Sequence, residues 1–267
     1  MSRLEGRVAI VSGGGTGIGA ATARAFAREG AKVVVTGRRP EPIEAVAAEV
    51  EGLAVAGDAA DPDHATETVR LAVSRFGGLD VVVANAASGY GGAAGDVDEE
   101  RWRRTIDVNL TGPLLLVRAA LPAMLDRGAG AIVLVSSVSG LVSGPESAAY
   151  VTSKAGLLGL TRSLSVDYGP NGIRANAICP GWVVTPMGDR AMDGLAKQRG
   201  ISREEAYRLV SANAPLRRPA TAEEIAACCV FLASDESSIV TGTALIADGG
   251  GMAVDVADLA FGEPSSP

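Results

Sequence analysis

A tyrosine and a lysine lie four residues apart in the segment Tyr150-Val151-Thr152-Ser153-Lys154. Residues i and i+4 share one face of a helix, so the two side chains are neighbours if this segment is helical. A nearby ammonium group stabilises a phenolate and lowers the pKa of the phenol. The pair is then suited to exchanging a proton with an alcohol or ketone oxygen. The same spacing also occurs by chance on surface helices, so it needs independent support.

A hydroxyl group is expected near the same place. The apolar run Ala131–Ser136 continues into Ser137-Val138-Ser139-Gly140. If the run is a strand, Ser137 lies at its carboxyl end, where its hydroxyl could donate a hydrogen bond to a substrate oxygen. The alternative is an ordinary serine-rich turn.

A glycine-rich segment, Ser12 to Gly19, follows the first apolar run and opens an alanine-rich helical pattern. Phosphate oxygens bind backbone N–H groups at a helix N-terminus, and close approach favours residues without a Cβ atom. A strand before the glycines and a helix after them indicate a dinucleotide-binding turn. Its predicted cofactor-binding residues are Gly13, Gly15, Thr16, Gly17, Ile18 and Gly19.

The second apolar run ends in Gly37-Arg38-Arg39, at the position where enzymes that use NAD place an acidic residue. A guanidinium group binds a 2′-phosphate with two parallel hydrogen bonds, whereas a carboxylate repels it. Arg38 and Arg39 therefore favour NADP over NAD. The alternative is a solvated loop, because exposed arginines are common.

Strands and helices alternate along the chain and position these groups. Runs of β-branched residues predict buried parallel strands, at Arg7–Ser12, Lys32–Thr36, Leu53–Ala56, Val81–Ala84, Ala131–Ser136, Ile173–Ile178 and Ala244–Ala247. Helical patterns occur between them, at Thr16–Arg28, Pro42–Val50, His64–Phe76, Glu99–Met124 and Ser147–Tyr168. Gly112-Pro113 is expected to bend or break the fourth helix.

The predicted fold class is α/β, a single Rossmann-type doubly wound parallel sheet of about seven strands with helices on both faces. We expect one domain over residues 1–267, with a frayed tail at 262–267. Segment 187–215 interrupts the alternation after a strand end. We interpret it as a lid over the substrate, with an ordinary pair of surface helices as the alternative.

Composition excludes several function classes. A net charge of −7 argues against nucleic acid as a partner. The three cysteines match neither a disulfide framework nor a zinc site, and no metal is expected. The single histidine, His64, is expected to face solvent and lacks the context of a Ser-His-Asp triad. No signal peptide and no run of ~20 apolar residues is visible, which favours a cytoplasmic protein away from membranes.

The chain resembles the short-chain dehydrogenase/reductase family along nearly its whole length. Six motifs carry the resemblance in the expected order, namely SGGGTGIG at 12–19, NAA at 85–87, DVNLTG at 107–112, SS-x-x-G at 136–140, YVTSK at 150–154 and PG-x-x-x-T at 180–185. The resemblance covers both 3-oxoacyl-carrier-protein reductases and 3-hydroxybutyrate dehydrogenases. Two small departures are Ser12 in place of threonine and Ala87 in place of glycine.

The resemblance implies a role for each matched residue. Tyr150 would be the general acid/base, Lys154 would lower its pKa and bind the nicotinamide ribose, and Ser137 would polarise the carbonyl. Asn109 would hold a water that relays protons to Lys154. The remaining implied cofactor contacts are Asp58, Ala59, Asn85, Ala86, Pro180, Gly181, Val183 and Thr185.

The expected activity is hydride transfer between a nicotinamide cofactor and a small carbonyl or alcohol substrate, such as a 3-oxoacyl compound. The plausible substrate contacts are Ser139, Tyr90, Trp182 and Met187. The resemblance also implies a homotetramer. A nucleotide-sensing protein without turnover is the alternative, although such proteins would be expected to lose Tyr150 or Lys154. An epimerase or dehydratase would usually carry a longer C-terminal region.

Overall fold

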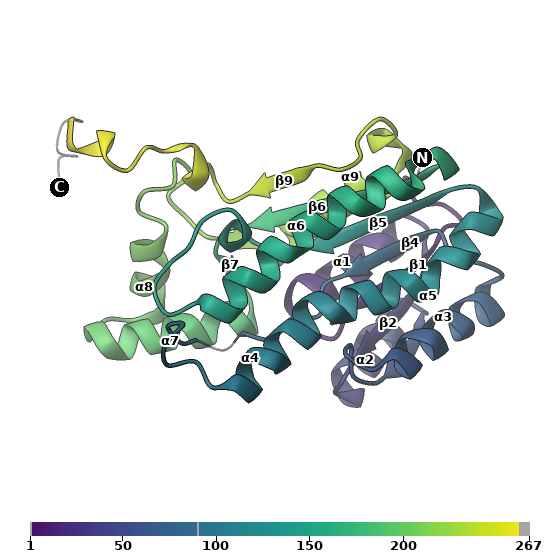
Figure 1. Cartoon of the computed structure of the whole chain (residues 1–267), viewed down its shortest axis with the longest axis horizontal. Coiled ribbons are helices and arrows are strands. Elements are labelled where there is room, and N and C mark those ends of the chain that lie inside the picture. The colour runs from purple at the N-terminus through teal and green to yellow at the C-terminus, as the bar shows by residue number, and fades with distance from the viewer. Residues whose placement is uncertain (1, 90, 262–267) are drawn as a thin grey trace.

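The computed structural model describes residues 2–89 and 91–261 and has a seven-stranded parallel sheet at its centre (Figure 1). The strand order is β3-β2-β1-β4-β5-β6-β9, which confirms the predicted doubly wound sheet. The strands are β1 (Val8–Ser12), β2 (Lys32–Gly37), β3 (Leu53–Ala56), β4 (Val81–Ala84), β5 (Gly130–Val135), β6 (Ile173–Pro180) and β9 (Ala244–Ala247). The predicted tail at 262–267 lies outside the described residues.

The strands of the sheet centre are apolar throughout because both faces of the sheet are covered. Side chains alternate between the two faces of a strand. In β1, Ala9 and Val11 join one hydrophobic core, while Val8 and Ile10 join the other. All four residues are buried.

Helices pack on both sides of the sheet. Residues of α1, α2 and α9 build the core on one face, and residues of α3, α5 and α6 build the core on the other. The bounds of these helices are α1 (Gly17–Arg28), α2 (Pro40–Glu49), α3 (Pro62–Phe76), α5 (Gly112–Arg127), α6 (Ala148–Tyr168) and α9 (Ala222–Ala233). Small alanine side chains in α1 and α9 let these two helices lie side by side on the sheet.

Gly112-Pro113 was expected to bend or break the fourth helix, and the structure shows no break. Helix α4 (Glu99–Ile106) continues through a π-helical turn, Asp107–Thr111, directly into α5. Proline has no N–H to donate, so its position after the wider turn removes only one backbone hydrogen bond. The continuous helix Glu99–Arg127 is long and apolar enough to span a membrane by composition. Half of its apolar window is buried, as in a core helix of an α/β domain.

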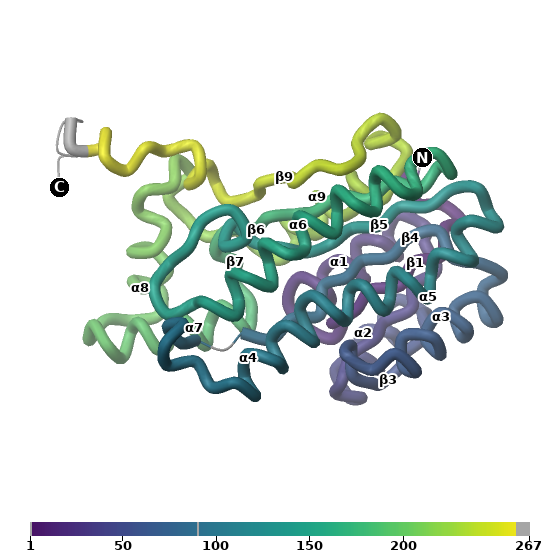
Figure 2. Tube along the Cα trace, viewed as in Figure 1, coloured from purple at the N-terminus to yellow at the C-terminus, as the bar shows by residue number. Residues whose placement is uncertain are grey.

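Two further helices follow β6 and the short strand β7 (Val183–Val184), which pairs with β8 (Ala220–Thr221). These are α7 (Pro186–Arg199) and α8 (Arg203–Val210), and they extend beyond the carboxyl ends of the strands (Figures 1 and 2). Met192, Ala206 and Tyr207 form a small core between them. The predicted insertion at 187–215 is therefore largely a packed helix pair.

Candidate active site

A cleft of about 1390 Å³ runs across the carboxyl ends of the strands. It collects nearly all of the predicted site residues, namely Gly13, Gly15, Thr16, Gly17, Ile18, Arg38, Arg39, Asp58, Ala59, Asn85, Ala86, Ser137, Ser139, Tyr150, Lys154, Pro180, Gly181, Trp182, Val183, Thr185 and Met187. Gly19 and Asn109 are buried and are absent from the described wall of this cleft. Tyr90 lies outside the described residues.

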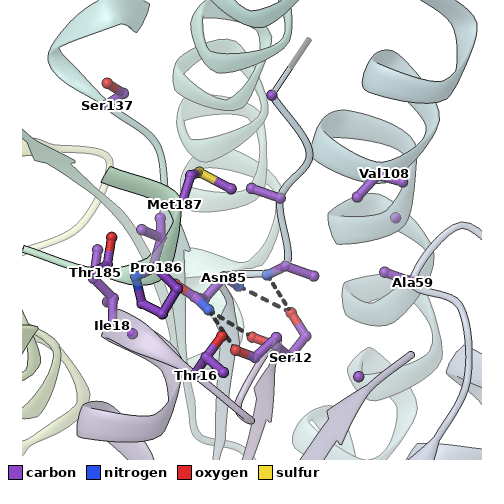
Figure 3. Close-up of a pocket in the computed structure, with 18 of the residues that line it drawn as sticks. Ser12, Thr16, Ile18, Ala59, Asn85, Val108, Ser137, Thr185, Pro186 and Met187 are labelled. Atoms are coloured by element: carbon purple, nitrogen blue, oxygen red, sulfur yellow. Dashed lines mark hydrogen bonds between the residues drawn. The ribbon is translucent and has the colours of Figure 1, made fainter. Parts of the chain in front are cut away.

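The phosphate-binding turn is fixed to the end of β4 by hydrogen bonds (Figure 3). The Ser12 hydroxyl accepts from the backbone N–H groups of Asn85 at 3.0 Å and Ala86 at 3.1 Å. The Asn85 side-chain amide donates to the carbonyl oxygens of Ser12 and Gly13. Its amide therefore shapes the turn, a role that the implied cofactor contact did not include. Serine in place of threonine keeps the hydroxyl that this arrangement needs.

Gly13 cannot be replaced without moving the turn. Its φ is +62°, in the left-handed region that favours glycine. A Cβ atom on Gly13 would also lie 2.8 Å from the Cα of Ala86. The turn is thus pressed against the end of β4, where the two strand ends form the centre of the cleft.

The start of α1 presents free N–H groups to the cleft. Thr16 is the N-cap residue and has an extended backbone, but its side chain makes no capping hydrogen bond. The first N–H groups of a helix have no intrahelical partner. Together with the helix dipole they form a site suited to an anionic phosphate.

Two cationic side chains, Arg38 and Arg39, lie in the cleft just after the end of β2. Arg38 and Arg39 are exposed and line it, and within residues 2–89 and 91–261 neither makes a side-chain hydrogen bond or ion pair. Asp58 forms an ion pair with Arg104 at 2.6 Å. Burial raises the pKa of Asp58, but hydrogen bonds from the Ala60 N–H and Arg104 outweigh it, so the pKa lies below its usual value.

The prediction that His64 faces solvent was wrong. Its ring is part of the cleft wall, and its Nε2 atom lies 2.7 Å from the Thr36 hydroxyl oxygen. Burial lowers the pKa of the imidazole despite the nearby carboxylates of Asp61 and Asp58. No sequence motif marked this contact, because it joins the first turn of α3 to the end of β2.

Ser137, Tyr150 and Lys154 meet on the cleft floor. Tyr150 and Lys154 lie one turn apart on α6, with the Lys154 Nζ atom 5.6 Å from the centre of the tyrosine ring. Burial raises the pKa of Tyr150, and a hydrogen bond with Ser137 opposes that rise. Ser137 lies two residues after the end of β5, so the strand end and the helix bring the two hydroxyl groups together.

The last residue of β5 fixes the position of the Lys154 side chain. Its Nζ atom donates to the carbonyl oxygen of Val135 at 2.8 Å, and the residue is 2% exposed. Burial lowers the pKa of Lys154 to about 8. The amine therefore remains mostly protonated at neutral pH. A buried ammonium beside a phenol is what a tyrosine acid/base requires.

Asn109 lies in the π-helical turn and is fully buried. Its side-chain amide bonds the backbone of Ser88 and donates to the Ser153 hydroxyl at 3.1 Å. These contacts occupy the amide with protein partners. The predicted water relay would therefore have to use another atom of this turn.

Ser139, Trp182 and Met187, which were predicted as substrate contacts, all line the cleft. Sequence reasoning did not place Glu146 and Ser147 here, although they also line this wall. Glu146 has a φ of +51°, an uncommon conformation for a residue with a side chain. These residues come from loops without a recognisable motif, so only the fold brings them to the cleft.

Residues 13–251 match the family model described as Enoyl-(Acyl carrier protein) reductase. The chain belongs to the short-chain dehydrogenase/reductase family. The protein MoaE of Klebsiella aerogenes is 44% identical over 96% of this chain and 99% of its own length. A D-beta-hydroxybutyrate dehydrogenase of Rhizobium meliloti (strain 1021) is 34% identical over 91% of this chain and 98% of its own length.

A solved structure shares both the sequence pattern and the fold. Aldohexose dehydrogenase of Thermoplasma acidophilum, in ligand-free form, superposes with a TM-score of 0.87 at 32% identity. The match covers 100% of this chain and 99% of the other. This short-chain dehydrogenase/reductase is therefore an oxidoreductase that uses a nicotinamide cofactor on a small-molecule substrate.

Proposed function

We propose that the enzyme transfers hydride between NADP(H) and a secondary alcohol or ketone, with Tyr150 as the general acid/base. The observation that carries this proposal is the meeting of Ser137, Tyr150 and Lys154 on the floor of one cleft. A hydroxyl, a phenol and a buried ammonium would then converge on one substrate oxygen.

Each of the three side chains has a distinct task in this proposal. The Ser137 hydroxyl donates a hydrogen bond to the substrate oxygen and stabilises the negative charge that develops there. Tyr150 gives its phenolic proton to that oxygen in reduction and accepts it in oxidation. Lys154 stabilises the phenolate through its positive charge, and the Val135 carbonyl fixes the position of that charge.

The cleft has the features that a dinucleotide requires. When bound, the cofactor supplies or accepts the hydride at its nicotinamide ring. The free N–H groups of α1 suit the pyrophosphate, and Pro180, Gly181, Val183 and Thr185 would flank the nicotinamide. The guanidinium groups of Arg38 and Arg39 line the cleft and hydrogen-bond to none of the described residues, which supports NADP over NAD.

We further propose a 3-oxoacyl or similar small carbonyl substrate. The wall beyond Tyr150 combines apolar contacts from Trp182 and Met187 with the Ser139 hydroxyl. Such a mixture suits a short carbon chain with a few polar groups. The similarity to D-beta-hydroxybutyrate dehydrogenase supports a substrate with oxygen at the third carbon.

The wider organisation of the protein follows as part of the same proposal. Residues 1–267 would form one domain, with 187–215 as the lid over the substrate. Exposed apolar side chains on α5 and α6, such as Leu114 and Val166, would pack in a homotetramer. Free cysteines at 179, 228 and 229 are typical of a reducing compartment, which supports a cytoplasmic location.

A spectrophotometric screen of ketones and acyl thioesters with NADPH and NADH tests activity, cofactor and substrate class together. The Tyr150→Phe variant should lose turnover on every accepted substrate while keeping its dinucleotide affinity within about twofold, because only the acidic hydroxyl is removed. Full residual activity in this variant would refute the assigned acid/base role. Dinucleotide binding without turnover on any substrate would instead favour the nucleotide-sensing alternative.

A further inference from the structure

Tyr207 of α8 is buried at the base of the helix pair, although it lies twenty-two positions after the last matched motif. Its hydroxyl donates to the Asp189 carboxylate at 3.0 Å, and the same oxygen lies 3.4 Å from the carbonyl oxygen of Val183. Asp189 belongs to the first turn of α7, whereas Val183 belongs to β7. One phenol therefore connects three elements.

The segment touched by Tyr207 is the one proposed to flank the nicotinamide. Thr185 is the N-cap of α7, and its hydroxyl accepts from the Gly188 N–H at 3.1 Å. A Cβ atom on Gly188 would lie 2.6 Å from the Tyr207 hydroxyl oxygen. The phenol is thus packed directly under the turn that connects Val183 to α7.

The Tyr207 phenol keeps its proton at neutral and moderately alkaline pH. Burial and the Asp189 carboxylate raise the pKa of Tyr207 to about 12, so the phenol remains a neutral donor. Asp189 is itself oriented by Arg203, which lies 3.8 Å away and also forms a closer ion pair with Asp193 at 2.6 Å. Arg203, the first residue of α8, thereby adds a second contact between α8 and α7 beside that of the phenol.

We propose that Tyr207 is a positioning residue that holds the Val183–Gly188 turn against the nicotinamide end of the cofactor. This inference rests on the proposed function, because that function assigns Val183 and Thr185 to the nicotinamide. Tyr207 does not line the described cleft and acts through the turn. Gly17 of the phosphate turn lies against Thr185, so displacement of Thr185 would open the cleft between its two halves.

The proposal predicts an effect on one end of the cofactor only. The adenosine end is built from β1, β2 and α3, none of which Tyr207 contacts through its hydroxyl. Loss of the phenolic hydroxyl should therefore weaken binding of the whole dinucleotide and leave binding of a fragment without nicotinamide unchanged. A general loss of structure would weaken both.

The test measures dissociation constants for NADPH and for 2′-phospho-ADP-ribose by calorimetry, in wild-type protein and in Tyr207→Phe. We expect NADPH to bind about tenfold more weakly, the size of one lost hydrogen bond to a charged acceptor, with fragment affinity unchanged within about twofold. Tyr168→Phe is the matched control. Tyr168 is the last residue of α6 and packs against the core, and the described structure gives its hydroxyl no hydrogen-bond partner.

Two variants of Asp189 test the same hydrogen bond from its other side, so the test still works if Tyr207→Phe does not fold. Asp189→Asn retains an acceptor oxygen and should bind NADPH nearly as wild type does, whereas Asp189→Ala should match Tyr207→Phe. The double variant Tyr207→Phe/Asp189→Ala should be no worse than either single change, because both remove the same contact. That pattern supports the proposal.

Three outcomes would overturn it, namely equal losses for NADPH and the fragment, no loss for either, or additive effects in the double variant. The proposed function fails separately. Wild-type protein that binds both compounds but turns over no substrate contradicts catalysis and leaves the positioning role of Tyr207 to be decided by the binding data. Wild-type protein that binds neither compound overturns both proposals.

Discussion

The side-chain amide of Asn109 hydrogen-bonds to both the N–H and the carbonyl group of Ser88. Its Oδ1 atom accepts from the Ser88 N–H at 2.7 Å, and its Nδ2 atom donates to the Ser88 carbonyl oxygen at 2.8 Å. Asn109 lies in the π-helical turn between α4 and α5, and Ser88 lies in the loop after β4. The turn therefore fixes the loop that carries Asn85 and Ala86 into the cleft.

Asn109→Ala should destabilise the protein, because it removes a buried side-chain amide and leaves the half-buried Ser88 N–H and carbonyl groups without their partner. We expect the free energy of unfolding to fall by about 1 to 3 kcal/mol, the size of two lost hydrogen bonds. Urea unfolding measures this directly. An unchanged midpoint, or an unchanged hydrogen-exchange rate at the Ser88 amide, would contradict the role assigned to this contact.

Ser137→Ala should reduce kcat by about 10²- to 10³-fold, the usual effect of removing one donor to a developing oxyanion. KM for the cofactor should change little, because the hydroxyl faces the substrate oxygen. Ser143→Ala is a suitable control, since its exposed hydroxyl bonds only the neighbouring Gly144 carbonyl in the described structure. Similar kcat values for the two variants would argue against carbonyl polarisation by Ser137.

Lys154→Met should abolish turnover and change how stability depends on pH. The pKa of Lys154 in the folded protein is lowered from 10.5 to about 8. Between these values the unfolded chain binds more protons, so wild-type stability rises with pH relative to the variant. Urea unfolding at pH 7 and pH 10 should show a change of about 2 to 3 kcal/mol in favour of wild type. A difference that does not vary with pH would contradict the lowered pKa.

Arg38→Ala should weaken NADPH binding by tenfold or more and NADH binding by less than about twofold, because only the 2′-phosphate needs the guanidinium group. Fluorescence titration with both reduced cofactors gives the comparison. Arg199→Ala removes an equal charge at the exposed end of α7, away from the described cleft, and should affect neither cofactor. Equal losses for NADPH and NADH in Arg38→Ala would reject the phosphate contact.

Most of the sheet could be predicted because its signal is local. The β-branched runs at Lys32–Thr36 and Val81–Ala84 are typical of strands covered on both faces, and the structure has strands there. The meeting of Ser137 with Tyr150 was also predictable, because both follow from strand and helix ends within fourteen residues of sequence.

The predictions for His64 and for a break at Gly112-Pro113 failed because, in each case, contacts between segments distant in sequence determine the structure. His64 is drawn into the cleft by Thr36, twenty-eight positions earlier. The helix through Gly112-Pro113 continues because a π-helical turn absorbs the missing donor of Pro113, and the buried amide of Asn109 fixes that turn. Single-sequence periodicity carries no information on either partner.

The cleft is lined by two consecutive parts of the chain, and the boundary between them in the sheet lies between β1 and β4. Residues 12–68 line the part of the cleft proposed for adenosine, while residues from 85 onward line the rest and include Ser137, Tyr150 and Lys154. Chimeras joined between α3 and β4 could therefore exchange dinucleotide preference without rewriting carbonyl selectivity, provided that Ser12 and Asn85 remain compatible across the joint. The contacts proposed for the 2′-phosphate could then stay unchanged while the substrate wall varies.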